Sequence, residues 1–263
     1  MHSHTIGNDL ATSLLNWRFW ARFAWQDVVN ANIRTHLGVV LYPMLAGVWI
    51  LTISLLFGDL LGGGRDDFMA YVAVGYVVFT FLSGCITASY SVFSRNLKII
   101  QNMPIGIMNF PLRETARFLF QMGLQSITVV VIFLFNGFTP STALVFVPLA
   151  LVILVVFGLS LTVMFAIIGT FLPDLAAFTG SFMRLLFFVT PIWWFPGLTG
   201  GWRVLVADIN PITHFIRIFR YPLLEGALPP LSTLAVVTAS TLLVVALSLS
   251  LFAATRRHIL LRL

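Results

Sequence analysis

Six apolar stretches, each close to the length of a bilayer-spanning helix, constrain the fold of this chain more than any other feature. A helix needs roughly 20 mostly apolar residues to cross the hydrocarbon core, and its backbone polar groups must be satisfied within the segment. The stretches cover residues 39–57, 69–93, 118–135, 143–171, 175–194 and 231–254. They predict an all-α integral membrane protein with six transmembrane helices.

Composition supports this fold class and indicates one domain. Of the 263 residues, 59% are hydrophobic and 9% are charged, whereas soluble domains have about 25% charged residues. We therefore predict a single membrane domain over residues 1–263, with no fused soluble enzyme or ATPase. Its predicted parts are a tail and interface helix (1–36), spans 1–2 (39–93), a cytoplasmic coupling loop (94–117), spans 3–5 (118–194), an external gate segment (195–230), span 6 (231–254) and a cytoplasmic tail (255–263).

The N-terminal region is predicted to be retained and to form an amphipathic helix. Residues 1–13 are polar and lack the apolar core of a signal peptide. In residues 14–34, apolar side chains and a polar row both recur at helical spacing. Tryptophans beside arginines are typical of a helix in the membrane interface, although a cytosolic packing helix has similar spacing. The interface candidates are Trp17, Arg18, Trp20, Arg22 and Trp25.

The basic residues predict the orientation, because cytoplasmic loops carry an excess of Lys and Arg. Arg184 lies within a span, and the other side of the predicted topology carries four basic residues: Arg65, Arg203, Arg217 and Arg220. The side with both termini and residues 94–117 carries ten: Arg18, Arg22, Arg34, Arg95, Lys98, Arg113, Arg117, Arg256, Arg257 and Arg262. That side is expected to be cytoplasmic. Because most of the net charge of +6 lies beside membrane ends, we expect no nucleic-acid partner.

The sequence lacks the motifs of an enzyme or an ion-coupled carrier. A phosphate-binding loop needs a lysine after its glycines, but the only lysine, Lys98, lies in RNLKII. No HExxH, GxSxG or spaced Cys/His motif occurs, and the pair Asp66-Asp67 lies in a glycine-rich loop. The acids fall in loops or at span ends, unlike the buried acids of many proton or sodium sites. We expect no catalytic residue, metal or cofactor on this chain, and an external source of energy for transport.

The second span has two distinctive faces. Thr80, Gly84 and Ala88 recur at four-residue spacing and predict a small-residue face on which another helix packs closely. An adjacent polar edge offers hydrogen bonds to sugar hydroxyls, and its residues are Ser83, Thr87, Tyr90 and Ser91. Ordinary helix packing, with each hydroxyl bonded to its own backbone, is the alternative interpretation.

The fifth span contains Arg184, the one charge deep in an apolar stretch. Insertion scales put the cost of a central arginine at about 2.5–3.5 kcal/mol. Arg184 therefore either serves a transport pathway, attracting an anionic headgroup such as a diphosphate, or snorkels to the nearby interface. Aromatic residues follow it, where rings stack on sugars or form an interfacial belt. The pathway candidates in this stretch are Arg184, Phe187, Trp193 and Trp194.

Residues 195–230 are too apolar for a simple connector, and Pro and Gly interrupt them too often for a span. Residues 204–207 and 212–219 are predicted to be two short re-entrant helices on either side of Asn210-Pro211. Such helices are tolerated at membrane depth where protein or a water-filled cavity covers their ends. We interpret the segment as an external gate with the candidate residues Asn210, Pro211, His214, Arg217 and Arg220.

The order of these elements and four short stretches resemble a known family. The stretches are RTHLG at 34–38, LFFVTPI at 186–192, Asn210-Pro211 followed by RYPLLEG at 220–226, and the basic tail RRHILLRL at 256–263. Over nearly its whole length the chain resembles the permease subunit of type 2 ABC exporters, specifically the Wzm-type O-antigen and capsular polysaccharide exporters. The family often has a tryptophan shortly after the Leu-Gly pair, whereas Leu41-Tyr42-Pro43 follows here.

The resemblance implies an activity, a location and partners. It implies a homodimer in the bacterial inner membrane, bound to two copies of a cytoplasmic ATPase that holds ATP and magnesium. The implied cargo is an undecaprenyl-diphosphate-linked polysaccharide, with O-antigen as the leading candidate. A short amphipathic helix ending at Pro104 would dock on the motor, or would be an ordinary basic connector. The coupling candidates are Arg95, Asn96, Leu97, Lys98, Ile99, Ile100, Gln101 and Met103.

Other functions fit parts of the sequence. An ABC permease for another lipid, a teichoic acid or a drug would share the fold. A membrane-embedded glycosyltransferase acting on polyprenyl-linked sugars would need a carboxylate-bearing catalytic loop, and the sequence offers no convincing one. A structural assembly protein without transport is a third class.

Overall fold

The computed structural model describes residues 12–33, 36–61, 66–102, 106–199 and 201–262, and over these ranges it contains helices and connecting segments but no β-strand. Within these ranges, five helical segments are long and apolar enough to cross a membrane: Gly38–Leu61, Phe68–Arg95, Asn109–Phe135, Thr142–Phe171 and Leu231–Thr255. The chain is therefore a helical, membrane-embedded protein. Arg34, Arg65 and Met103 lie outside the described residues, as do the side chains of residues 256–263.

Helix α4 (Phe68–Thr87) is the centre of the bundle, because 72% of the apolar window around it is buried, against 33% or less for the other four long helices. Apolar residues lie on all its faces, as expected for a helix surrounded by others. Its neighbours are α3 (Leu41–Leu61), α7 (Asn109–Phe135), α8 (Val147–Phe171), α9 (Leu175–Val189) and α12 (Pro211–Arg220).

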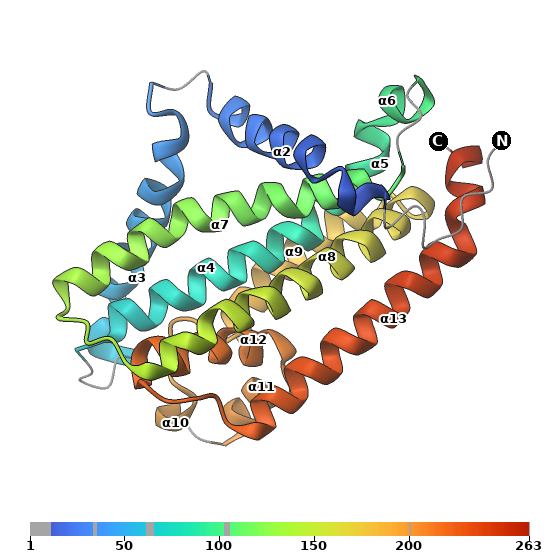
Figure 1. Cartoon of the computed structure of the whole chain (residues 1–263). Coiled ribbons are helices and arrows are strands. Elements are labelled where there is room, and N and C mark those ends of the chain that lie inside the picture. The colour runs from blue at the N-terminus through green and yellow to red at the C-terminus, as the bar shows by residue number, and fades with distance from the viewer. Residues whose placement is uncertain (1–11, 34–35, 62–65, 103–105, 200, 263) are drawn as a thin grey trace.

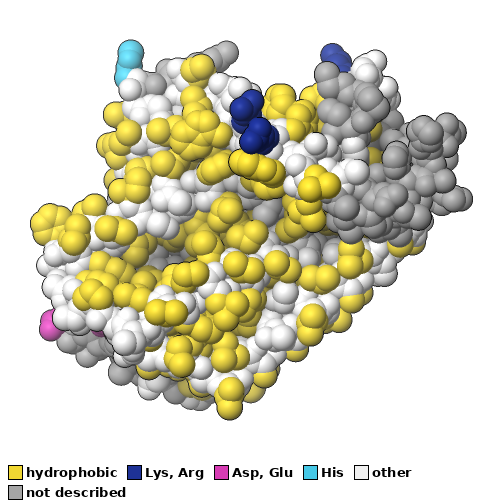
Figure 2. All heavy atoms as spheres, viewed as in Figure 1, with side chains coloured by type: hydrophobic (Ala, Val, Ile, Leu, Met, Phe, Trp, Pro, Cys, Tyr) yellow, Lys and Arg dark blue, Asp and Glu magenta, His cyan; other side chains and the backbone are white. Residues whose placement is uncertain are grey.

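Figure 1 shows two ends of the bundle with different elements. At one end lie α2 (Trp17–Ala31), α5 (Val92–Arg95), α6 (Leu97–Asn102), the start of α7 and the end of α13 (Leu231–Arg262). At the other end lie the connection between α7 and α8, α10 (Pro196–Thr199), α11 (Trp202–Ile209) and α12. On the face drawn in Figure 2, hydrophobic side chains cover the middle, and the Lys and Arg side chains lie toward the end with α2 and α6.

The structure changes the predicted start of the third span. Helix α7 begins at Asn109 rather than near residue 118, so residues 109–117 of the predicted coupling loop belong to this helix. The apolar run marks where a helix enters hydrocarbon, but Asp27 and Glu114 pair with neighbouring arginines and allow the helix to start earlier. Pro111 is tolerated there because the first turn needs no intrahelical N–H bonds.

The predicted fifth span is a shorter helix than expected. Helix α9 has 15 residues, which corresponds to about 22 Å at 1.5 Å per residue and falls short of the roughly 30 Å hydrocarbon core. It ends because Thr190, which precedes Pro191, adopts the extended conformation that a following proline favours. Residues 190–195 continue as an irregular segment in the direction of α10.

The two short helices predicted within residues 195–230 are present. They are α11 and α12, and Asn210 separates them. The Asn210 side chain accepts a hydrogen bond from the N–H of Ile212 at 3.0 Å and so caps α12, and Pro211 occupies its first position. A single turn of π-helix, η4 (Tyr221–Glu225), then ends at Gly226, whose φ of 63° is the left-handed conformation that glycine favours at a helix end.

The close approach of α8 to the 3₁₀ turn η2 (Ser89–Ser91) depends on Gly169, because a Cβ atom there would overlap the Tyr90 backbone. We predict that Gly169→Ala destabilises the protein by about 1–3 kcal/mol, the usual cost of overpacking, as measured by thermal unfolding in detergent. Gly123→Ala on α7 is the matched control, because a Cβ atom there meets no atom within 4 Å. Equal melting temperatures for the two variants would contradict this packing.

Candidate functional site

A groove with a volume of about 800 Å³ runs between α3, α4 and α9. Five residues predicted to line a pathway lie along it: Ser83, Thr87, Arg184, Phe187 and Trp193. Other residues in the groove are Trp49, Thr52 and Leu56 from α3, Tyr76, Phe79 and Thr80 from α4, and Gly180, Met183 and Phe188 from α9. The structure thus collects side chains from three helices and the segment after α9, and the predicted candidates lie on α4, on α9 and in that segment.

The polar edge of α4 divides into two parts. Ser83 and Thr87 face the groove, and the Thr87 hydroxyl donates to the Ser83 carbonyl at 2.8 Å. Tyr90 and Ser91 lie outside it: the buried Tyr90 hydroxyl bonds the Thr179 hydroxyl at 2.8 Å, and Ser91 donates to the Ala88 carbonyl at 3.3 Å. Tyr90 and Ser91 therefore hold the break between α4 and α5. The bonds of Thr87 and Ser91 to nearby carbonyls of their own segment agree with the alternative interpretation, in which each hydroxyl bonds its own backbone.

The small-residue face of α4 packs as predicted at Gly84. The ring of Phe118 on α7 occupies the space that a side chain at Gly84 would fill. Thr80 donates to the Gln125 side-chain oxygen at 3.0 Å and ties the same two helices together. This contact fixes the wall of the groove that carries Ser83 and Thr87.

Arg184 is the one charged residue among those that line the groove in the described part of the chain. It is exposed, and its guanidinium donates to the Ser181 hydroxyl at 3.1 Å on the preceding helical turn. Phe187 follows one turn later and packs edge-on against Phe79 of α4, with ring centroids 5.3 Å apart. A positive charge therefore faces the groove beside an aromatic wall.

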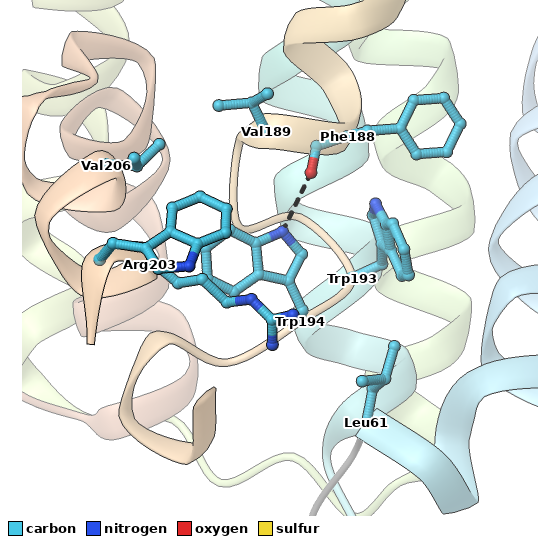
Figure 3. A pocket seen from close by; sticks show the side chains of 8 residues that line it. Leu61, Phe188, Val189, Trp193, Trp194, Arg203 and Val206 are labelled. Atoms are coloured by element: carbon cyan, nitrogen blue, oxygen red, sulfur yellow. Dashed lines mark hydrogen bonds between the residues drawn. The ribbon is translucent and has the colours of Figure 1, made fainter. Parts of the chain in front are cut away.

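A second cavity of about 400 Å³ adjoins the groove, since Phe188 and Trp193 line both. Figure 3 shows its residues, which come from the end of α3, from α9 and the segment after it, and from α11. The Trp194 ring N–H donates to the Phe188 carbonyl at 3.2 Å, the dashed line in Figure 3. Trp194, predicted to line the pathway, thus lies at this aromatic end rather than in the main groove.

Sequence reasoning missed two members of this aromatic end. Trp202 and Arg203 on α11 line the second cavity, with the guanidinium carbon of Arg203 5.8 Å from the Trp202 ring centroid. The adjacent Trp-Arg pair at the start of the first short helix was the available signal.

Arg220, predicted to be a gate residue, is a buried anchor. Its guanidinium donates to the carbonyls of Tyr71 (2.9 and 3.2 Å), Pro191 (2.7 Å) and Ile192 (3.0 Å). Its central carbon lies 3.3 Å from the Tyr71 ring centroid. Gly75 makes this possible, because a Cβ atom there would lie 2.5 Å from the guanidinium. Arg220 therefore fixes the irregular segment that carries Trp193 and Trp194 against α4.

The other predicted gate residues brace α11 and α12. Asn210 donates to the Thr190 hydroxyl at 2.9 Å, which joins the segment after α9 to the break between the short helices. His214 lies 2.9 Å from the Asp208 carbonyl, and Arg217 forms an ion pair with the Asp208 carboxylate at 2.8 Å. These contacts hold the two short helices in one arrangement.

The predicted coupling stretch forms the short helix α6, with one apolar face. Ile100 is buried, Ile99 packs against the same cluster, and Lys98 and Gln101 are exposed. Leu97 is half-buried, and the Asn96 side chain donates to the Val92 carbonyl at 2.7 Å. The predicted amphipathic helix is therefore present over its described residues.

A charged network links the base of α6 to α2 and α7. Glu114 on α7 is buried and pairs with Arg95 at 3.3 Å and with Arg117. Arg113 binds both carboxylate oxygens of Asp27 on α2, at 2.6 and 2.7 Å, and also contacts the Asn96 side chain at 3.4 Å. Arg95, which was predicted to be a docking residue, therefore also forms an ion pair within the chain.

Helix α2 lies on α7, with a buried apolar side and an exposed side that carries Trp17 and two arginines. Ala24 and Val28 are buried, and Trp25 packs edge-on against Phe120. Trp17, Arg18 and Arg22 are exposed, whereas the Trp20 N–H donates to the Ser13 carbonyl at 3.0 Å. The predicted amphipathic helix is confirmed as a helix.

No protein-family model matches the chain, and no curated protein matches it. In the part of the chain that the structure describes, no group of three or more His, Cys, Asp and Glu side chains is placed to hold a metal ion.

The aromatic end of the groove is predicted to depend on Arg220. In Arg220→Met the Ile192 carbonyl loses the donor that Arg220 supplies, and the Pro191 carbonyl keeps only the longer bond from the Tyr71 hydroxyl at 3.3 Å. A buried carbonyl left without a donor costs roughly 1–3 kcal/mol. We expect a lower melting temperature and a red shift of tryptophan emission as Trp193 and Trp194 gain access to solvent. Arg22→Met is the control, because Arg22 is exposed and lies on α2, away from this cavity. A wild-type melting temperature for Arg220→Met would show that the anchor is dispensable.

Proposed function

We propose that this chain is the transmembrane permease subunit of an ATP-driven exporter, moving a lipid-linked polysaccharide across the bacterial inner membrane. The observation that carries the proposal is the groove itself, which joins hydroxyls, one arginine and a wall of aromatic rings from α3, α4 and α9. These groups suit a cargo with sugar rings and an anionic lipid headgroup. Undecaprenyl-diphosphate-linked O-antigen is the cargo that the sequence resemblance favours.

The topology of this proposal contains six membrane passages. Helix α9 and residues 190–195 make the fifth passage together, and α11 and α12 are re-entrant helices at the external side. Both termini and α6 then lie in the cytoplasm, in agreement with the ten basic residues predicted for that side. An arginine at the external end is acceptable in this topology when it is buried and bonded, as Arg220 is.

The groove would serve as half of a transport pathway. It is open along one side, so a second copy of the chain facing it would complete an enclosed channel in a homodimer. In that channel Arg184 would attract the diphosphate of the carrier lipid, and Ser83 and Thr87 would offer hydrogen bonds to sugar hydroxyls. The aromatic end at Trp193 and Trp194 would stack on sugar rings near the exit.

Energy would enter through α6, at the opposite end of the molecule from the aromatic cavity (Figure 1). Its exposed Lys98 and Gln101 would dock on a separate ATPase that binds ATP and magnesium. Movement of α6 would reach α7 through Glu114 and reach α2 through Arg113, because these side chains bond residues of α5 and the α5–α6 junction. From α7 it would pass to α4 at the contact between Phe118 and Gly84.

A permease for another lipid, a teichoic acid or a drug is the second candidate. The specific observation in its favour is the mostly apolar groove lining, which would accept a lipid or drug without a sugar chain. A polyprenyl-sugar glycosyltransferase is less well supported, because the groove residues described include no carboxylate.

Arg184→Ala is predicted to reduce export roughly tenfold or more, since hydrogen bonds to charged groups contribute about 1.5–3 kcal/mol. The measurement is surface polymer in cells whose chromosomal copy is replaced by the variant, with membrane expression matched. Arg184→Lys is the paired variant and should retain much of the activity, because it keeps the positive charge. Normal surface polymer from a well-expressed Arg184→Ala protein would remove Arg184 from the pathway.

Lys98→Glu combined with Gln101→Glu is predicted to abolish co-purification with the partner ATPase, because two exposed residues of the docking face would become acidic. Arg95 is left unchanged because its reversal would also break the pair with Glu114. The control is Arg18→Glu, an exposed change of the same sign on α2. Full ATPase recovery with the double variant would place the docking surface elsewhere.

A further inference from the structure

The aromatic cavity of about 400 Å³ beside the groove has one charged side chain among its described lining residues, that of Arg203. Across the described part of the chain, Arg203 forms no ion pair with an acidic side chain. Asp208, the acid on the same helix, pairs instead with Arg217 at 2.8 Å and does not line the cavity. The cavity therefore carries a positive charge that no acid of its described lining neutralises.

The Arg203 guanidinium is placed to bind an anion. Its central carbon lies 5.8 Å from the centroid of the Trp202 ring, and Figure 3 shows the side chain extending toward Trp194. A guanidinium that stacks on an aromatic ring keeps the N–H groups at its edge available. Those N–H groups bind a carboxylate or a phosphate through two parallel hydrogen bonds.

The other lining groups offer ring faces and one further donor. The ring N–H of Trp193 is buried and has no hydrogen-bond partner in the described residues, whereas the ring N–H of Trp194 is bonded to the Phe188 carbonyl. A buried donor without an acceptor is unfavourable, and a ligand hydroxyl beside Trp193 would supply the acceptor. The indole faces suit a ring with an apolar side.

We propose that this cavity binds a hexuronic acid residue of a polysaccharide, with its carboxylate on Arg203, a hydroxyl on the Trp193 N–H and its ring against Trp202. The inference rests on the proposed function and narrows its cargo to polymers that contain acidic sugars. A quaternary ammonium, which aromatic cages often bind, would be repelled by Arg203. An anionic phospholipid would pair with Arg203 but would bring no ring to the indoles.

The carboxylate is tested with tetragalacturonate and its fully methyl-esterified form, which keeps the sugar rings but lacks the charge. Isothermal titration of the purified protein in detergent should show the acid binding about two- to fivefold more tightly than the ester, as for a partly exposed ion pair. Arg203→Gln should bind both equally. Arg22→Gln, an exposed arginine on α2, is the matched control and should keep the preference. Equal binding by the wild type, or a preference kept in Arg203→Gln, would overturn the proposal.

The ring contact is tested by Trp202→Leu, which should weaken binding of both forms by about two- to tenfold, as for other aromatic stacking contacts. Trp17→Leu is the control, because Trp17 is also exposed but lies on α2. Unchanged binding by Trp202→Leu would overturn the stacking.

A lipid phosphate as the partner of Arg203 is tested by native mass spectrometry of the protein released from phosphatidylglycerol nanodiscs. Arg203→Gln and Arg22→Gln should retain equal numbers of lipid adducts, and fewer adducts in Arg203→Gln would assign the guanidinium to a lipid and overturn the sugar site. None of these measurements requires the ATPase or export. Their failure would remove the acidic-sugar site and leave the proposed function, which the surface-polymer measurement tests separately.

Discussion

The guanidinium of Arg220 fixes the position of a segment that hydrophobic packing alone does not order. Burial of apolar side chains packs α4 against its neighbouring helices, but it does not determine the backbone path of the irregular segment after α9. Arg220 donates to two consecutive carbonyls of that segment, Pro191 and Ile192, and to Tyr71 on α4. A planar group with five fixed donors can satisfy carbonyls from two segments at once, which a lysine ammonium cannot match. The absence of a side chain at Gly75 is the complementary requirement.

This anchor explains how one end of the groove is built. Because residues 191–192 are held against α4, Trp193 lies between Phe57 of α3 and Phe188 of α9, with ring centroids 5.2 and 5.9 Å away. Asn210 adds a bond to Thr190 where α9 ends, so the short helices α11 and α12 are attached to the same segment. The aromatic end is therefore a consequence of buried hydrogen bonding rather than of aromatic packing alone.

The opposite end is organised by charge pairing. Glu114 and Asp27 each accept from arginines, and this neutralises the first turns of α7 against α2 and α5. Sequence pattern identified the short helix α6 but not the start of α7, because pairing partners such as Arg113 and Asp27 lie 86 residues apart in the chain. Hydrophobicity along the sequence identifies apolar runs. The start of a helix with charged residues depends instead on ion-pair partners that are distant in the sequence.

The sequence by itself determined the membrane class, the long apolar helices, the break at Asn210-Pro211 and the close packing at Gly84, because each depends on local hydrophobicity, proline or the lack of a side chain. It also led to the prediction of five pathway residues that share helical faces or adjacent turns: Ser83, Thr87, Arg184, Phe187 and Trp193. Only the tertiary structure decided that these residues meet in one groove, that Tyr90 and Ser91 do not, and that Arg220 is an anchor. Those outcomes depend on contacts across distant segments, such as the 149 residues between Arg220 and Tyr71, and on the burial that makes each carbonyl require a donor.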